Sequence, residues 1–220
     1  MAHVEPLDRE QIPALEGVMA SSEAMMGFVP NSMLTMAHMP QLAMAFSMFA
    51  GTVFGRDLRE IVANYQDSVP QDEASDQALP PHLVQLAAYA VSVSAGCRYC
   101  QAHTSHNAHK FGISEDKLQQ LLSYESSPLF DPAERALIAL SLAAGQVPNE
   151  TGPQHFEALS EHFTTRQIVQ LVGVVSLFGF LNRWNDTMAT QLEMIPRAFA
   201  SDTLAEAGWE VAKHGESDRS

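Results

Sequence analysis

Helix start and stop signals follow one another along nearly the whole chain. No segment alternates apolar and polar residues with the period of two that a half-buried strand requires. Prolines or capping residues open most segments, and glycines or polar residues end them. Valine-rich pieces at 91–93 and 172–175 lie inside longer helical patterns. The sequence therefore predicts an all-α fold. Helices are expected at 8–21, 31–54 with a break at Pro40, 80–95, 98–110, 114–124, 131–144, 151–162 and 164–192.

The chain of 220 residues, 46% of them hydrophobic, can bury a sizeable core within one domain. We expect a single helical domain over 1–220, with an exposed acidic loop at 66–79 and a C-terminal helix and frayed tail at 202–220. Nine of the 11 methionines lie at or before Met48. Because methionine fills irregular apolar gaps, we interpret this region as packed core in preference to a substrate pocket or a subunit interface.

The charge balance excludes one broad class of partner. The chain has 12 basic and 26 acidic residues, a formal charge of −14, and no basic cluster offsets it locally. Such a surface repels phosphate backbones, so we expect no nucleic-acid partner. The longest apolar stretch, 168–181, is interrupted by Gln170 and Ser176 and is too short to span a bilayer, so we expect no membrane partner. The start of the chain lacks an export-signal pattern, which predicts a cytoplasmic location.

The two cysteines of the chain, Cys97 and Cys100, form a single C-x-x-C tetrapeptide. A disulfide at this spacing closes almost no loop and adds little stability, but it lets two sulfurs exchange between dithiol and disulfide. Gly96 ends the preceding helix, and the next helix is expected to begin at or just after Cys97. The positive end of that helix favours a thiolate and lowers a thiol pKa from about 8.5 toward about 3.5–7.5. The spacing therefore predicts redox chemistry without a bound cofactor.

His103 is the neighbouring histidine on the surface of the same predicted helix and can reach Cys100 from there. His106 and His109 continue the three-residue spacing but drift around the helix, so one helix cannot close a tetrahedral metal site. A zinc site would need Cys97, Cys100 and His103 plus a ligand from elsewhere. The candidates for that ligand are His82, His155 and His162. We predict no metal, and leave this alternative open.

Four segments give the chain a recognisable pattern. They are Gly96-Cys97-Arg98-Tyr99-Cys100-Gln101-Ala102-His103-Thr104, Val29-Pro30-Asn31, Glu134-Arg135-Ala136-Leu137 and Phe180-Leu181-Asn182-Arg183-Trp184-Asn185-Asp186. With these segments the chain, from about residue 28 to about residue 195, resembles the carboxymuconolactone decarboxylase family and its alkylhydroperoxidase D (AhpD)-like branch that keeps C-x-x-C. The resemblance implies an all-α, oligomeric fold. It also implies that the second cysteine attacks a peroxide or disulfide, that the first resolves it, and that a histidine and a glutamate relay protons.

The chain departs from that pattern at both relay positions. The family's histidine often lies where this chain has Thr104, so we assign the proton relay to His103. The family's glutamate falls at Gln85, and an amide cannot shuttle a proton as a carboxylate does. Gln85 and Tyr89 share a polar stripe with His82 and Ser92 that can hold a water chain to the thiols. The alternative is a structural, hydrogen-bonded helix contact.

A second polar cluster follows the apolar stretch 168–181. It consists of Asn182, Arg183, Asn185 and Asp186. Buried charges must be paired, so we interpret this cluster as a structural network or subunit contact that holds the cysteine helix, in preference to a direct catalytic role.

These observations predict a cytoplasmic, homo-oligomeric antioxidant enzyme, a thiol-dependent peroxidase or disulfide oxidoreductase. Cys100 is expected to attack the hydroperoxide or disulfide substrate, Cys97 to resolve it, and His103 to relay the proton, with Gln85 and Tyr89 in support. A dithiol reductant would restore the enzyme. Two alternatives stay open: a non-redox, lactone decarboxylase-like enzyme, which would not need its thiols, and a non-catalytic helical or metal-binding assembly.

Overall fold

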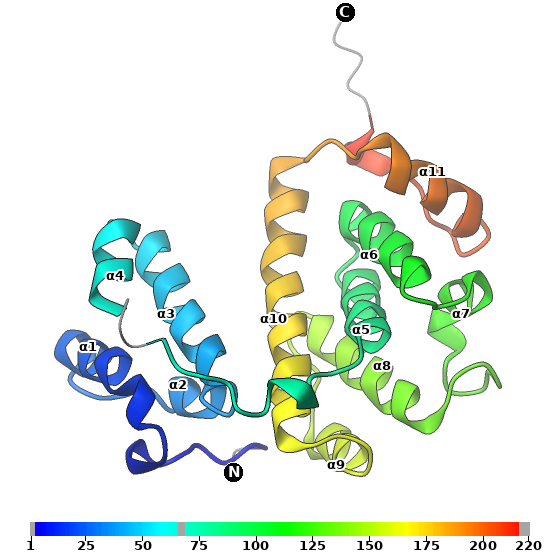
Figure 1. Ribbon diagram of the computed structural model, residues 1–220. Coiled ribbons are helices and arrows are strands. Elements are labelled where there is room, and N and C mark those ends of the chain that lie inside the picture. Colours follow the sequence, from blue (N-terminus) through cyan, green and yellow to red (C-terminus); the bar gives the residue numbers. More distant parts are fainter. Residues whose placement is uncertain (1–2, 66–68, 216–220) are drawn as a thin grey trace, which may run out of the picture. The chain divides into compact units, whose positions relative to one another are not determined.

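The computed structural model describes residues 3–65 and 69–215, and every regular element in these ranges is helical, which confirms the predicted fold class (Figure 1). The α-helices are α1 Glu16–Met26, α2 Asn31–Met36, α3 Pro40–Val53, α4 Leu58–Tyr65, α5 Pro81–Ser94, α6 Arg98–Lys110, α7 Glu115–Gln119, α8 Pro132–Gly145, α9 Pro153–Ser160, α10 Thr165–Met188 and α11 Met194–Thr203. None of the helices within the described ranges is both long and apolar enough to cross a membrane.

The helix bounds agree best with the prediction where the sequence contains a recognisable capping motif. Asp131 caps α8 through a side-chain contact with the Glu134 backbone N–H at 2.8 Å, while the Glu134 carboxylate accepts from the Asp131 N–H at 3.0 Å. The first predicted helix differs, because Pro13 lacks an N–H and two 3₁₀ turns precede α1. The sequence also missed α4, and it extended α10 beyond its end at Met188.

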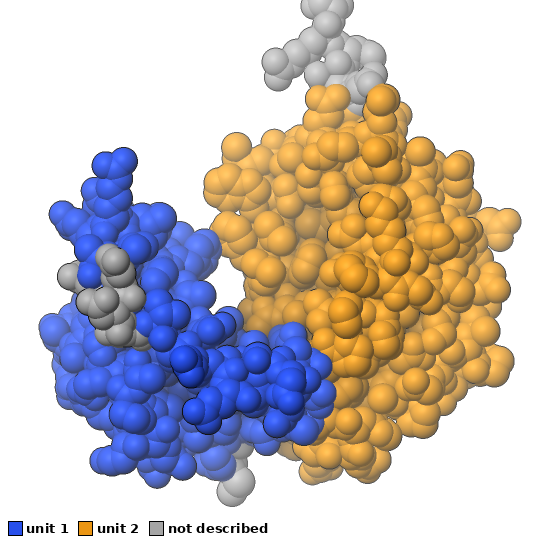
Figure 2. All heavy atoms as spheres, in the orientation of Figure 1, with its two compact units in different colours: residues 1–78, 164–170 blue, residues 79–163, 171–220 orange. Residues whose placement is uncertain are grey.

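The expected single domain resolves into two compact units, Met1–Ala78 with Thr164–Gln170 and Leu79–Phe163 with Leu171–Ser220 (Figure 2, blue and orange). The methionine-rich region builds the core of the first unit, as predicted: Met19, Met33 and Met44 are buried against Leu15 and Ile61.

Most described residues of the predicted exposed loop at 66–79 are exposed, but the Asp72 side chain is buried. Within the first unit the Asp72 carboxylate pairs with the Arg166 guanidinium, and both side chains are only 9% exposed. A buried charge is costly unless it is paired, and this ion pair therefore fixes the loop to the start of α10. Residues 66–68 lie outside the described part of the chain.

In the second unit α5 packs between α6 and α8 (Figure 1). Leu86 of α5 and Leu137 of α8 are fully buried. At one end, the Gln101 side chain donates to the Ser92 carbonyl at 3.2 Å, and the Ser94 hydroxyl donates to the Leu142 carbonyl at 2.6 Å. These contacts hold the junction between α5 and α6 in place.

The C-terminal segment is ordered further than predicted. A C-terminal helix and a frayed tail were expected over 202–220. In the structure, Trp209 donates its indole N–H to the Arg98 carbonyl at 3.1 Å, and the Leu192 N–H donates to the His214 carbonyl at 2.9 Å. His214, in the short 3₁₀ helix Ala212–His214, is only 1% exposed. Residues 216–220 lie outside the described part. The segment therefore packs against the start of α6 and cannot be treated as a tail.

Candidate active site

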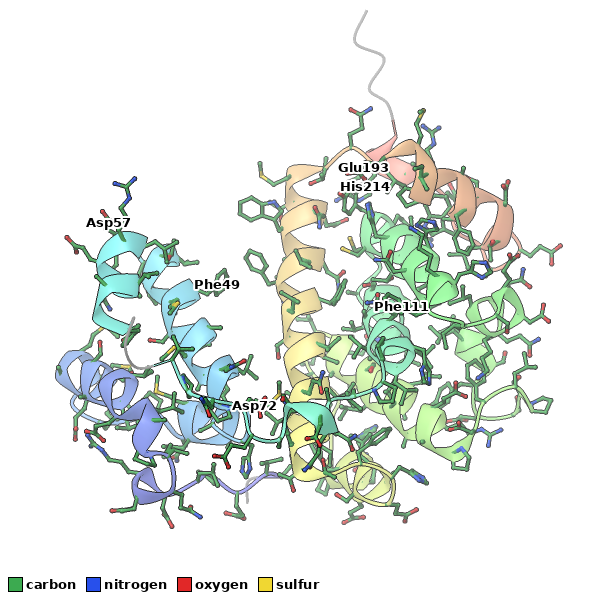
Figure 3. The ribbon with its side chains drawn as sticks, viewed as in Figure 1. Phe49, Asp57, Asp72, Phe111, Glu193 and His214 are labelled. Carbon is green, nitrogen blue, oxygen red and sulfur yellow. The ribbon has the colours of Figure 1, made fainter. Side chains whose placement is uncertain are left out.

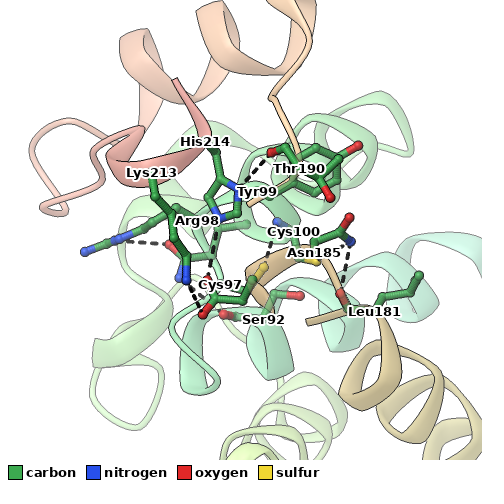
Figure 4. A network of polar contacts seen from close by, with 12 residues as sticks. Ser92, Cys97, Arg98, Tyr99, Cys100, Leu181, Asn185, Thr190, Lys213 and His214 are labelled. Carbon is green, nitrogen blue, oxygen red and sulfur yellow. Dashed lines mark hydrogen bonds and ion pairs between the residues drawn. The ribbon is translucent and has the colours of Figure 1, made fainter. Parts of the chain in front are cut away.

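The two cysteines lie at the start of α6, as the sequence predicted. Gly96 adopts φ +72, the left-handed conformation that ends α5 without strain. Cys97 is the N-cap of α6, and its Sγ accepts the Cys100 backbone N–H at 3.4 Å (Figure 4). Both thiols are free, and they are 1% and 3% exposed. The helix start therefore places a sulfur where backbone N–H groups and the helix dipole favour negative charge.

The surroundings of the two thiols push their pKa values apart. Donation from the Cys100 thiol lowers the pKa of Cys97, helped by the backbone N–H groups of Cys100 and Tyr99 and opposed by burial and the Asp186 charge. The pKa of Cys100 is raised, first by its hydrogen bond to Cys97 and then by burial. The Asn185 amide contacts the Cys100 sulfur at 3.6 Å. Cys97 is therefore the member of the pair that the structure favours as thiolate.

His103 is held by groups other than the thiols. Its Nδ1 lies 3.0 Å from the Tyr99 carbonyl, and its Nε2 lies 3.0 Å from a Glu193 carboxylate oxygen. Its ring stacks on Tyr99 at 4.3 Å between centroids. Burial, and then the hydrogen bond to Glu193, raises the pKa of Tyr99 to about 12. Both His103 nitrogens therefore face oxygens of Tyr99 and Glu193, and among the described residues no hydrogen bond joins either nitrogen to a cysteine.

The predicted supporting groups are Gln85 and Tyr89 of α5. The Tyr89 hydroxyl donates to the Leu118 carbonyl at 3.3 Å, and burial raises the pKa of this phenol. Gln85 is half-buried, and within the described residues no hydrogen bond joins it or Tyr89 to a cysteine. Ser92 donates to the Ala88 carbonyl of its own helix. The contacts of Tyr89 and Ser92 thus favour the structural interpretation of the polar stripe.

Two residues that were not assigned to the site lie beside Cys97. A ligand atom of Cys97, one of Asp186 and one of His214 all lie within 4.8 Å of one another. Lys213 Nζ lies 2.8 Å from an Asp186 oxygen, and its hydrogen bond lowers the pKa of that carboxyl. His214 Nδ1 lies 2.8 Å from the Thr190 carbonyl (Figure 4). Figure 3 labels His214 and Glu193, which come from the C-terminal segment and from the start of α11.

The sequence offered a signal for only one of these two residues. Asp186 belonged to the polar cluster that we interpreted as structural, and its neighbour Asn185 also contacts a thiol. His214 lay in the expected tail and carried no motif. Its contact with Cys97 depends on the return of the C-terminal segment over α6, which local patterns do not encode.

The same three atoms raise the question of a metal. Cys97, Asp186 and His214 are the only group among the described residues whose ligand atoms lie close enough together. The carboxylate is already neutralised by the Lys213 ammonium, and a second cation there would be repelled. The donor set therefore fits a metal poorly. The zinc site considered from sequence is not assembled, since His103 faces Glu193.

A cavity of about 350 Å³ lies next to Asp186. It is bordered by the ends of α5 and α8 and by α10, and its lining includes Val91, Gly145, Val175, Asn182 and Asp186. Asn182 is 4% exposed, and neither atom of its amide has a hydrogen-bond partner. A buried amide without a partner is costly, and it lies here in the lining of a cavity of the size that small-molecule sites have.

Comparisons with known proteins bear on the family of the chain. A sequence model of the carboxymuconolactone decarboxylase family matches residues 62–143, which include both cysteines. The crystal structure of the debrominase Bmp8 is 31% identical to this chain, with alignment over 92% of this chain and 96% of that one and a TM-score of 0.53. The chain belongs to the carboxymuconolactone decarboxylase family. The resemblance drawn from the sequence is thereby confirmed at the level of the family.

Three further proteins are similar to this chain. A Bmp8 variant in which a cysteine is replaced by alanine, in complex with 2,3,4-tribromopyrrole, is 29% identical over 92% of this chain and 98% of that one, with a TM-score of 0.54. The uncharacterized protein YdfG of Bacillus subtilis (strain 168) is 29% identical over 46% of this chain and 67% of its own length. The uncharacterized protein YnjA of Escherichia coli (strain K12) is 25% identical over 53% of this chain and 64% of its own length.

Proposed function

We propose that this family member is a dithiol oxidoreductase that reduces an electrophilic small molecule and is itself oxidised to a Cys97–Cys100 disulfide. The observation that carries the proposal is that the two thiols differ in pKa. One has a lowered pKa at a helix N-terminus, and the other is held as a thiol beside it. A thiolate is the attacking form in exchange chemistry, and a neighbouring thiol resolves the product.

A hydroperoxide is the first substrate class. The Cys97 thiolate attacks the outer peroxide oxygen, the O–O bond breaks, and the alkoxide leaves as an alcohol after gaining one proton. The Cys100 thiol then attacks the sulfenic acid sulfur and releases water. In total, one hydroperoxide and two thiols give one alcohol, one water and one disulfide. The dithiol loses two electrons, and the O–O bond gains them.

A halogenated aromatic is the second substrate class. The similarity to the debrominase Bmp8 over nearly the whole chain favours it. Here one aryl bromide and two thiols give one arene, one hydrogen bromide and one disulfide, so the ring carbon is reduced by the same two electrons. The cavity next to Asp186 has a volume that suits a compact ring, and Asn182 belongs to its lining.

The roles of the cysteines in this proposal reverse those implied by the family resemblance. The resemblance assigned attack to Cys100 and resolution to Cys97. Hydrogen bonds from the Cys100 thiol and from backbone N–H groups stabilise negative charge on Cys97, while the same thiol contact disfavours it on Cys100. We therefore assign the nucleophile to Cys97.

One equivalent of oxidising substrate is expected to convert the protein to the intramolecular disulfide. The reduced protein is mixed with cumene hydroperoxide, or separately with a brominated pyrrole, and its intact mass is recorded. We expect a loss of about two mass units, because two thiol hydrogens leave. Alcohol or bromide should appear in equal amount. The substrate that gives this result identifies the class.

The Cys97→Ser/Cys100→Ser protein is the control for that experiment. In the unsubstituted protein, the survival of both thiols in the presence of either substrate, under conditions in which dithiothreitol is oxidised, would contradict the proposal. Substrate turnover by the double variant would favour the non-redox alternative. The dithiol reductant, the homo-oligomeric state and the cytoplasmic location stay predictions.

A further inference from the structure

His214 is a buried histidine with one nitrogen satisfied and the other unpaired. The ring is 1% exposed. Nδ1 lies 2.8 Å from the Thr190 carbonyl, which can only accept, so Nδ1 carries the hydrogen of this contact. Nε2 has no hydrogen-bond partner. In the neutral ring this atom carries a lone pair, and buried polar atoms without a partner are rare enough to require a reason.

The unpaired nitrogen lies against the charged part of the site. Nε2 is 3.5 Å from an Asp186 carboxylate oxygen, and a nitrogen of this ring, the Cys97 sulfur and an Asp186 oxygen lie within 4.8 Å of one another. A carboxylate at this distance stabilises an imidazolium, and a ring nitrogen this close to a thiol is in a position to take its proton. The nitrogens of His103, by contrast, face Tyr99 and Glu193.

The position of the ring is built by contacts on several sides. The Leu192 N–H donates a hydrogen bond to the His214 carbonyl at 2.9 Å. The centroids of the Tyr99 ring and the imidazole lie 5.7 Å apart. The Trp209 indole ties the same segment to the Arg98 carbonyl, one residue from Cys97. Buried side chains with several fixed contacts lose little further freedom on reaction, which is the property expected of a preorganised base.

We propose that His214 is the proton acceptor for Cys97 and that Asp186 stabilises the imidazolium that forms. The proton moves from the Cys97 thiol to His214 Nε2 and gives a thiolate and imidazolium pair. After the attack on substrate, the imidazolium returns that proton to the leaving oxygen. The inference rests on the proposed function in one respect, namely that Cys97 is the nucleophile.

Three other charged or titratable groups near His214 affect how strongly a thiolate and an imidazolium are favoured. The Asp186 charge alone disfavours a thiolate at Cys97. Lys213 offsets part of that charge from the same 3₁₀ helix as His214. Tyr99 faces the ring from α6, and its raised pKa keeps the phenol neutral near pH 7. A proton on His214 therefore places positive charge near both Asp186 and the thiolate, and favours both.

The test measures the reactivity of Cys97 without any substrate. In a Cys100→Ser background Cys97 is the sole thiol, and its rate of alkylation by iodoacetamide is followed from pH 5 to pH 10. His214→Asn keeps a donor for the Thr190 carbonyl but has no base at the Nε2 position. We expect alkylation at pH 7 to fall about tenfold, and its midpoint to rise by about one pH unit. The exposed His162→Asn is the matched control, expected to leave both values unchanged.

A second measurement does not require a His214 variant to fold. The ring of His214 is titrated by NMR in the Cys100→Ser protein and in the Cys97→Ser/Cys100→Ser protein. Loss of the thiolate is expected to lower the His214 midpoint by about one unit, because the coupled charges stabilise each other. An unchanged midpoint here, or an unchanged alkylation profile in folded His214→Asn, would overturn the inference. Neither readout depends on turnover, so a failure to reduce hydroperoxides or aryl bromides would count against the proposed function alone.

Discussion

Cys97→Ser is expected to abolish the first chemical step, and Cys100→Ser to stop the reaction after it. Cys97→Ser removes the sulfur at the start of α6, and with it the contact that most raises the pKa of Cys100. Burial and the Asp186 charge still raise that pKa, so we expect Cys100 not to replace Cys97 as the thiolate. We expect turnover to fall by at least about 10³-fold in either variant, as is typical when a covalent nucleophile or its partner is removed. The Cys100→Ser protein should consume a single equivalent of hydroperoxide and gain one oxygen atom as a sulfenic acid.

Intact mass and stoichiometry separate the two variants. A thiol-reactive probe for sulfenic acid should label Cys100→Ser after peroxide treatment and leave Cys97→Ser unlabelled. The reverse pattern would assign the nucleophile to Cys100, as the family resemblance implied. Circular dichroism provides the control for folding, since each substitution changes one buried atom in an otherwise unchanged helix start.

Glu134→Ala is expected to be the most destabilising polar substitution in the second unit. Glu134 is 3% exposed, and its carboxylate oxygens lie 2.5 and 2.7 Å from Lys117 Nζ. Alanine removes the capping contact to Asp131 and leaves a mostly buried ammonium without its partner. Removing one member of a buried pair costs about 3–5 kcal/mol, and the partial exposure of Lys117 favours the lower end. We expect the free energy of unfolding to fall by about 3 kcal/mol.

Chemical denaturation measures this loss of unfolding free energy, and two further variants serve as controls. The exposed Glu157→Ala on α9 should change stability by less than about 0.5 kcal/mol. Lys117→Met combined with Glu134→Ala should lose less than the sum of the single substitutions, because the stranded charge is removed. A loss below about 1 kcal/mol in Glu134→Ala alone would mean that water replaces the carboxylate around Lys117.

Local signals predicted the parts of the structure that local contacts build. Gly96 and the cysteine spacing placed Cys97 at a helix start, and the Asp131 to Glu134 spacing predicted the cap of α8. Both features depend on residues within one turn of each other. The helical pattern likewise predicted the fold class, because periodicity is a property of each segment.

The residues around the thiols could not be predicted in this way. His103 is next to Cys100 on the helix surface, yet Glu193 from the start of α11 binds its Nε2. His214 and Asp186 meet Cys97 only because α10 and the C-terminal segment both return to the start of α6. Such contacts follow from tertiary packing, which a single sequence without local motifs does not reveal. The division into two units was missed for the same reason.

The measurement that most directly tests the central claim is the site of alkylation in the unmodified protein. The reduced protein is treated with less than one equivalent of iodoacetamide at pH 7, digested, and mapped by mass spectrometry. Both cysteines are almost fully buried, and Cys100 is slightly the more exposed residue, so residue exposure does not favour Cys97. The lowered pKa of Cys97 predicts that the label lies mainly on Cys97, whereas the same treatment in denaturant should label both equally. A label mainly on Cys100 in the folded protein would contradict the assignment of Cys97 as the reactive thiolate.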